Sequence, residues 1–155
     1  DKMKRVLMVC LGNICRSPMA EGIFRAKTAE AGIELEVDSA GTADYHVGEE
    51  PDPRAIENMR SHGIDISNLR GRQFVQEDFD RFDHIFTMDE SNHLNVLRLA
   101  RTEEDKAKVS MFLNSLVPGS NSPVPDPWFG GNDGFEDVFQ MLSKTSDKIV
   151  EELKK

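Results

Sequence analysis

Cys10 and Arg16, a cysteine and an arginine separated by five residues, are the pair whose types and spacing point most clearly to chemistry. Backbone N–H groups of a short loop can converge on an anion, and a helix that follows adds its positive end. Arg16 can hold two phosphate oxygens with its planar guanidinium. The same positive field favours the thiolate form of Cys10, which is the nucleophilic form. The pattern therefore indicates attack of a cysteine on a bound phosphate group.

The residues between this pair fit the same interpretation. Gly12 permits the backbone conformations of a tight anion cradle, and Ser17 can donate a hydrogen bond to the sulfur of Cys10. The predicted phosphate-binding loop comprises Leu11, Gly12, Asn13, Ile14, Cys15, Arg16 and Ser17. A cysteine at the end of a buried strand can also be a small hydrophobic residue, so the flanking elements have to decide.

A strand and a helix are predicted on either side of the loop. The run 4–10 is short and apolar, as in a buried strand, and it ends before Gly12. Ser17 and Pro18 open a helix, with Ser17 as its N-cap and proline at the first helical position. Gly32 is expected to end it. Its apolar face comprises Met19, Ile23, Phe24 and Ala31.

The rest of the chain alternates between short apolar runs and amphipathic stretches. Strands are expected at 35–38, 84–88 and 109–113, and helices at 51–62, 89–100 and 135–153, with a turn-rich stretch at 118–134. The residues expected to face inward in the last two helices are Leu94, Val96, Leu97, Phe135, Val138, Phe139, Leu142, Ile149, Val150 and Leu153. This alternation predicts a single α/β domain over 1–155: three layers, a four-stranded parallel sheet flanked by helices, and the phosphate loop after the first strand.

Composition limits the classes of partner. The chain has 155 residues and a formal net charge of −9, which argues against nucleic acid. No apolar run approaches the roughly 20 residues of a membrane span, so no membrane partner is expected. Two cysteines and four scattered histidines form neither a disulfide framework nor a metal-ligand pattern, which favours the cytoplasm and no metal. Asp1 and Lys2 precede a methionine, as a remnant ahead of the natural start would.

Four motifs together resemble the low-molecular-weight protein tyrosine phosphatases. They are C-L-G-N-I-C-R-S-P-M-A-E from Cys10, V-D-S-A-G-T from Val37, T-M-D-E-S-N from Thr87 and V-P-D-P-W-F from Val124. The resemblance covers nearly the whole chain. It implies hydrolysis of phosphotyrosine proteins or small aryl phosphates, with acid phosphatase activity and no cofactor. Inorganic phosphate, sulfate and vanadate are then expected as active-site anions.

The resemblance also assigns a role to Asp126. Read alone, an aspartate followed by proline is a common start of a turn. In the family, the aspartate of a D-P-aromatic motif protonates the leaving oxygen, and Asp126 matches it. The implied catalytic residues are thus Cys10 as nucleophile, Arg16 as the phosphate ligand, and Asp126 as general acid and then general base through a phosphocysteine intermediate.

Supporting residues follow from the same resemblance. The family's loop asparagine adopts an unusual backbone conformation and hydrogen-bonds a serine, which implies a contact between Asn13 and Ser39. Asp89 is expected to cap a helix, with an indirect part in bracing the loop. The substrate pocket is expected to be lined by Leu11, Ile14, Tyr45, Trp128 and Phe129.

Three points distinguish this chain within the family pattern. Cys15 is either a buried spectator or a resolving thiol that captures oxidised Cys10 as a disulfide, as in family members with this second cysteine. Trp128 and Phe129 stand where many relatives have tyrosines that kinases modify. A histidine that braces the loop in many relatives is replaced, by Leu69 or, with a shift of one residue, by Asn68.

Three rival functions differ in what they require. An arsenate reductase of the same fold relays oxidation through later cysteines, and none follows Cys15. A phosphocysteine carrier domain of a sugar transport system needs neither Arg16 nor an acid such as Asp126. A non-catalytic phosphate-binding module needs the loop but not Asp126.

Overall fold

The computed structural model describes residues 3–129 and 132–155, apart from the side chains of Phe129 and Asn132. Its strands are β1 (Arg5–Cys10), β2 (Glu36–Gly41), β3 (His84–Thr87) and β4 (Val109–Met111), and its helices are α1 (Arg16–Glu30), α2 (Pro53–Ser61), α3 (Asp78–Arg81), α4 (Glu90–Leu97), α5 (Glu103–Ala107) and α6 (Asn132–Leu153). Two 3₁₀ helices, η1 (Phe112–Ser115) and η2 (Pro127–Phe129), complete the described elements.

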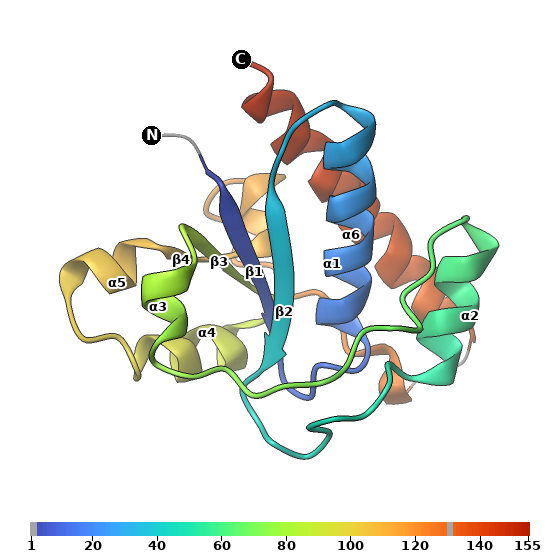
Figure 1. Cartoon of the computed structure of the whole chain (residues 1–155), viewed down its shortest axis with the longest axis horizontal. Helices are drawn as coiled ribbons and strands as arrows, with labels where there is room; N and C mark the ends of the chain where they lie inside the picture. The colour runs from blue at the N-terminus through green and yellow to red at the C-terminus, as the bar shows by residue number, and fades with distance from the viewer. Residues whose placement is uncertain (1–2, 130–131) are drawn as a thin grey trace.

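The four strands form one parallel sheet in the order β2-β1-β3-β4. Figure 1 shows β1 in the middle, with both chain ends near the amino end of the sheet and the loop after β1 at the opposite end. A central strand is covered on both faces, which is why the five residues after Arg5 in β1 are apolar without alternation and all buried. The α/β class, the parallel sheet and the position of the phosphate loop are confirmed.

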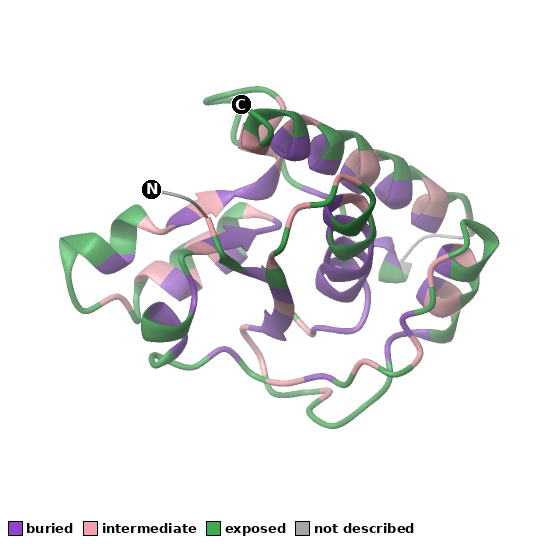
Figure 2. Cartoon of the chain, turned by 45° about the horizontal axis from the view of Figure 1, so that its top comes forward, coloured by how far each residue is buried: buried purple, intermediate pink, exposed green. Residues whose placement is uncertain are grey.

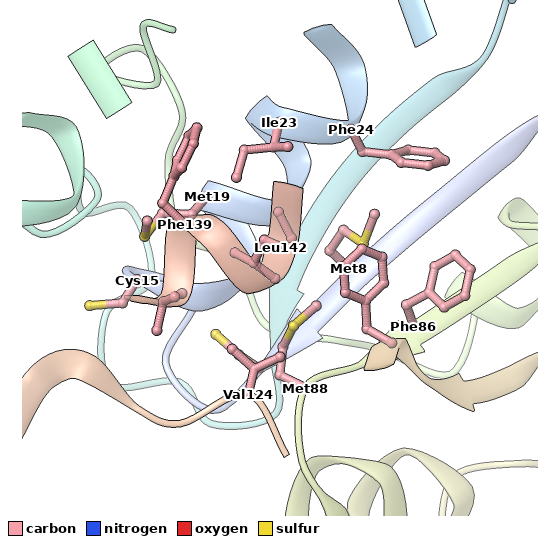
Figure 3. Close-up of a cluster of buried hydrophobic side chains, with 14 of the residues drawn as sticks. Met8, Cys15, Met19, Ile23, Phe24, Phe86, Met88, Val124, Phe139 and Leu142 are labelled. Carbon is pink, nitrogen blue, oxygen red and sulfur yellow. The ribbon is translucent and has the colours of Figure 1, made fainter. Parts of the chain in front are cut away.

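The two faces of the sheet carry separate cores. Val6 and Met8 face the core under α1 and α6, which also contains Phe24 of α1 and Leu142 of α6 (Figure 3). Leu7 and Val9 point the other way, into the core that contains residues of α3 and α4. Because side chains alternate along a strand, one apolar run supplies both cores.

Helix α1 lies between the sheet and α6, so its first part is buried on all sides. Every residue from Arg16 to Phe24 is buried, polar ones included (Figure 2). The predicted end is confirmed: Gly32 has a φ of 71°, and its N–H donates to the carbonyl of Ala29. A helix that starts in the interior can present polar side chains to a buried site.

Several predicted boundaries were wrong. Strand β2 runs on to Gly41, and the fourth strand ends at Met111, where η1 begins. The predicted helix at 89–100 ends at Leu97, and Leu94 is 45% exposed instead of inward. Leu94 and Val96 are two positions apart, which is about 200° around a helix, and the fully buried Val96 takes the inner face.

None of the helices in the described residues is long and apolar enough to span a membrane.

Candidate active site

Cys10 is the last residue of β1, and its sulfur lies under the start of α1. The side chain is 3% exposed. Its Sγ lies 3.0 Å from the hydroxyl oxygen of Ser17 and accepts a hydrogen bond from the backbone N–H of Asn13 at 3.3 Å. Ser17 was predicted as the N-cap of α1, but the helix begins at Arg16 with Cys15 as its N-cap. As the second residue of a buried helix, Ser17 directs its hydroxyl at the sulfur instead of at the helix end.

The loop beside Cys10 contains unused hydrogen-bond donors. Within residues 3–129 and 132–155, no protein acceptor contacts the backbone N–H groups of five loop residues: Gly12, Ile14, Cys15, Arg16 and Ser17. Buried backbone donors are almost always paired, and the helix N-terminus adds a positive partial charge at the same place. An anion bound beside Cys10 would supply the acceptors that the protein does not.

Asn13 holds the loop in shape. Its φ is 58°, in the left-handed region that asparagine tolerates better than most residues. Its side-chain amide donates to the hydroxyl oxygens of Ser17 at 2.8 Å and Ser39 at 3.0 Å. The structure therefore brings Asn13 and Ser39 together, as the sequence implied. The carbonyl oxygen of the same side chain accepts from the backbone N–H of Arg72 at 3.0 Å.

The hydrogen bond from Arg72 supports Asn13 in a chain that lacks the loop-bracing histidine of many relatives. Leu69 is packed against the hydrophobic core, and the hydrogen-bonded support of the Asn13 carbonyl comes from the main chain of Arg72. A backbone donor leaves no mark of residue type on the sequence, so this contact could not be predicted.

Glu21 extends the network to a charged end. Its buried carboxylate accepts from the Ser39 hydroxyl at 2.6 Å and pairs with Arg25. Burial raises the pKa of Glu21, while the hydrogen bonds from Ser39 and Arg25 act in the opposite direction. Sequence reasoning missed Glu21, because an acidic residue in the second turn of a helix usually faces solvent.

The Glu21 carboxylate, at the end of this network, fixes the direction of the hydrogen bonds along it. An ionised carboxylate can only accept, so Ser39 donates to Glu21 and accepts from Asn13. The Asn13 amide also donates to Ser17. The Ser17 hydroxyl then has two acceptors in reach, the sulfur of Cys10 at 3.0 Å and the Ala40 carbonyl at 3.4 Å, and the sulfur is the nearer. The network thus favours a hydroxyl that donates to the sulfur and stabilises negative charge on it.

Arg16 is buried beside the loop, 3% exposed. Its Nη1 donates to the Asp89 carboxylate at 2.6 Å and to the Val124 carbonyl at 3.1 Å. Burial lowers the pKa of Arg16, but Cys10 and Asp89 outweigh it, so the pKa is raised overall and the guanidinium stays charged. Asp89 also accepts from the Asn92 N–H and so caps α4, as predicted.

Asp126 approaches the same guanidinium from the other side. Its Oδ2 lies 3.9 Å from Arg16 Nη2, and its Oδ1 accepts from the Trp128 N–H at 3.0 Å. The segment before it is fixed by a backbone hydrogen bond from Val124 to Met88. Arg16 thus joins the loop after β1, which we also call the nucleophile loop, to the segment that carries the predicted acid.

Cys10, Arg16 and Asp126 line one cavity of about 170 Å³. Four predicted pocket residues line it too: Leu11, Ile14, Tyr45 and Trp128. The fifth, Phe129, has its side chain outside the described residues. His46 also lines the cavity and was missed; its ring is 6.3 Å from that of Trp128, and its Nδ1 lies 3.1 Å from Glu49.

Cys15 lines the cavity as a buried thiol. Burial raises its pKa far above the ordinary range, and the charges of Asp52, Cys10 and Asp126 act in the same direction. The two loop cysteines thus differ in surroundings: Cys15 lies among negative charges, whereas Cys10 faces Arg16.

Comparison with known proteins agrees with this site. The family model described as low molecular weight phosphotyrosine protein phosphatase matches residues 5–155. A relative of that description from Schizosaccharomyces pombe is 43% identical, with 96% of each chain covered. A crystal structure of a protein tyrosine phosphatase from Entamoeba histolytica with Hepes in its active site has a TM-score of 0.91 at 33% identity, covering 97% of both chains. A Drosophila arginine phosphatase has a TM-score of 0.89 at 32% identity, covering 97% of this chain and 98% of the other.

The fold and these matches define a phosphatase, and the cavity beside Cys10 lies at the carboxyl end of its parallel sheet. The chain belongs to the low molecular weight phosphotyrosine protein phosphatase family.

Replacing Asn13 tests whether the loop depends on its side chain. Asn13→Ala removes three side-chain hydrogen bonds. Each lost buried hydrogen bond costs about 1 kcal/mol or more. We therefore predict a fall in kcat of about 10–100-fold, measured with an aryl phosphate. Asn121→Ala is the matched control, since Asn121 also has a positive φ but lies exposed, and its activity should be unchanged. Equal activity of the two variants would contradict the bracing role.

Proposed function

We propose that the protein hydrolyses aryl phosphate monoesters, phosphotyrosine among them, through a phosphocysteine on Cys10. The observation that carries this proposal is the meeting of Cys10, Arg16 and Asp126 in one cavity, beside five backbone donors that find no acceptor among the described residues. A sulfur nucleophile, a cation for the phosphate and a carboxyl for the leaving group are the three parts that the reaction needs.

In the first step the thiolate of Cys10 attacks phosphorus. An S–P bond forms, the P–O bond to the leaving group breaks, and Asp126 gives its proton to the departing oxygen. Arg16 and the loop amides stabilise the charge on the other phosphate oxygens. In this scheme Arg16 is already oriented by Asp89, so its orientation costs little when substrate binds.

In the second step a water molecule releases the phosphate. Asp126, now a carboxylate, takes a proton from the water as its oxygen bonds to phosphorus. The S–P bond breaks and the electron pair returns to sulfur, where the Ser17 hydroxyl stabilises it. Water and a phosphate ester are thereby converted to an alcohol and phosphate. Asp126 gives a proton to the leaving oxygen in the first step and takes one from the attacking water in the second. It must therefore stay close to both oxygens, which fits its contact with Arg16.

Free inorganic phosphate, sulfate and vanadate are proposed to occupy the same cradle, since each presents several oxygens to the loop amides. The two free cysteines fit a reducing compartment, and we propose the cytoplasm. An arsenate reductase of this fold needs further cysteines downstream, and none follows Cys15 in this sequence. A carrier domain or a binding module would leave the contact between Arg16 and Asp126 unexplained.

The decisive test compares Cys10→Ser and Asp126→Ala with the parent on p-nitrophenyl phosphate and phenyl phosphate. Cys10→Ser should lose all turnover, because a neutral hydroxyl is a far weaker nucleophile than a thiolate. Asp126→Ala should lower kcat/KM for phenyl phosphate by about 10²–10⁴, the range of general acid catalysis, and for p-nitrophenyl phosphate by less, because its leaving group is stable as an anion. Full activity of Cys10→Ser would refute the proposal. Phosphate transfer to a partner without hydrolysis would favour the carrier domain.

Phosphoarginine is the second candidate substrate, because one structural neighbour is an arginine phosphatase. The cavity lining favours a tyrosyl ring: apolar and aromatic side chains predominate, and in the described part of the chain Asp126 is the only carboxylate among them. A guanidinium group would lack a free anionic partner there. We expect kcat/KM for a phosphotyrosine peptide to exceed that for the matched phosphoarginine peptide by about 10² or more. The reverse ratio would identify an arginine phosphatase.

We also propose that oxidation inactivates the protein reversibly through a disulfide between Cys10 and Cys15. Oxidation of Cys10 by peroxide gives a sulfenic acid, and attack by Cys15 would form a disulfide and release water. The raised pKa of Cys15 predicts a slow capture, because the attacking group must be a thiolate. After peroxide treatment, Cys15→Ser should regain less activity with thiol than the parent. Equal recovery would leave Cys15 as a spectator.

A further inference from the structure

Arg54, the second residue of α2, lies between the two loops of the site without lining the cavity. Its guanidinium grips Asp52 through both carboxylate oxygens, with Nε to Oδ1 and Nη2 to Oδ2 each at 3.0 Å. Burial of Asp52 opposes its charge, but the hydrogen bonds from Arg54 hold the pKa of that carboxyl below its usual range. A two-point contact fixes the plane of the guanidinium.

The orientation of that plane matters because its remaining contacts are on the acid loop, which we define as residues 124–128. Arg54 Nη1 donates to the Trp128 carbonyl at 3.3 Å. The guanidinium carbon lies 5.3 Å from the centre of the Trp128 ring and 4.9 Å from that of Phe135 in α6. The arginine is therefore held between the end of the acid loop and the start of the last helix.

The partner of Arg54 is also attached to the phosphate loop. The backbone N–H of Asp52 donates to the carbonyl of Ile14 at 2.8 Å, and its side chain caps α2 by accepting from the Arg54 N–H. One short segment, Asp52 to Arg54, thus contacts the nucleophile loop through its main chain and the acid loop through its side chain. Figure 1 shows α2 beside the first turns of α6, on the side of the molecule that carries both loops.

The acid loop is consequently fixed at both ends. At Val124, its N–H donates to Met88 and its carbonyl accepts from Arg16. At Trp128, the carbonyl accepts from Arg54 while the N–H donates to Asp126. Because Asp126 is hydrogen-bonded to the residue that Arg54 holds, a shift of Trp128 would move the Asp126 carboxyl. The first anchor lies in the catalytic machinery itself, whereas the second lies outside it.

We propose that Arg54 is a positioning residue for general acid catalysis: it places the Asp126 carboxyl at the leaving group by clamping Trp128 to the Asp52 cap of α2. The inference rests on the proposed function, in which Asp126 is the acid. A positioning role makes a specific kinetic claim. In kcat/KM, which reports the first step alone, loss of the clamp should cost only as much as the leaving group needs a proton.

Arg54→Met tests this claim, with Arg60→Met as the matched control on the same helix, where Arg60 is exposed. For phenyl phosphate, whose leaving oxygen needs a proton, kcat/KM should fall about 10–100-fold, within the cost of displacing a catalytic group by about 1 Å. For p-nitrophenyl phosphate, whose leaving group is stable as an anion, the fall in kcat/KM should be less than about threefold. Arg60→Met should match the parent with both substrates.

The double variant Arg54→Met/Asp126→Ala separates this inference from the proposed function. If Arg54 acts through Asp126, adding Arg54→Met to Asp126→Ala should change kcat by less than about twofold. Full additivity, or equal losses with both substrates, would overturn the positioning role while leaving Asp126 as the acid. If Asp126→Ala alone shows no loss, the proposed function itself fails.

A second variant covers the case in which Arg54→Met does not fold. Asp52→Asn keeps a good helix cap but removes the charge that orients the guanidinium. It should show the same dependence on leaving group in a milder form, with thermal unfolding near that of the parent. A folded Asp52→Asn protein with parental kcat on phenyl phosphate would overturn the inference.

Discussion

Negative charge collected at the carboxyl end of β1 is the constraint on which the site depends. In the proposed mechanism the thiolate, the substrate phosphate, Asp126 and Asp89 all surround Arg16, which among residues 3–129 and 132–155 is the only lysine or arginine that lines the cavity. A chain with a net charge of −9 supplies no general attraction for phosphate. The compensation is local and mostly neutral: unpaired backbone donors, a hydroxyl and the positive end of α1. This explains why the start of α1 is buried and why its polar residues are too.

Two networks hold that compensation in place, one on each side of the sulfur. On the β2 side, a directed chain of hydrogen bonds runs from Glu21 through Ser39 and Asn13 to Ser17. On the α4 side, Arg16 is tied to Asp89 and to the acid loop. In the proposed mechanism both networks are already formed before substrate enters, which would limit the reorganisation that slows a solvated site.

The parts of this design that depend on local spacing could be predicted from the sequence. The strand, the loop and α1 follow from an apolar run, a glycine and a serine-proline pair, and the family motifs brought Ser39, Asp89 and Asp126 to the site. What could not be predicted depends on tertiary contacts. Glu21, Arg54 and Arg72 meet partners 18, 74 and 59 positions away, and two of these contacts involve backbone atoms. Helices α3 and α5 have four and five residues, too few for a periodic pattern.

The most direct test of the account is to trap the covalent intermediate. The protein is mixed rapidly with p-nitrophenyl phosphate, quenched in acid and digested, and the peptides are weighed by mass spectrometry. The account predicts one added phosphoryl group on the sulfur of Cys10, forming as fast as the nitrophenol is released and absent from Cys10→Ser. A phosphoryl group on another residue, or steady turnover with none on Cys10, would contradict it.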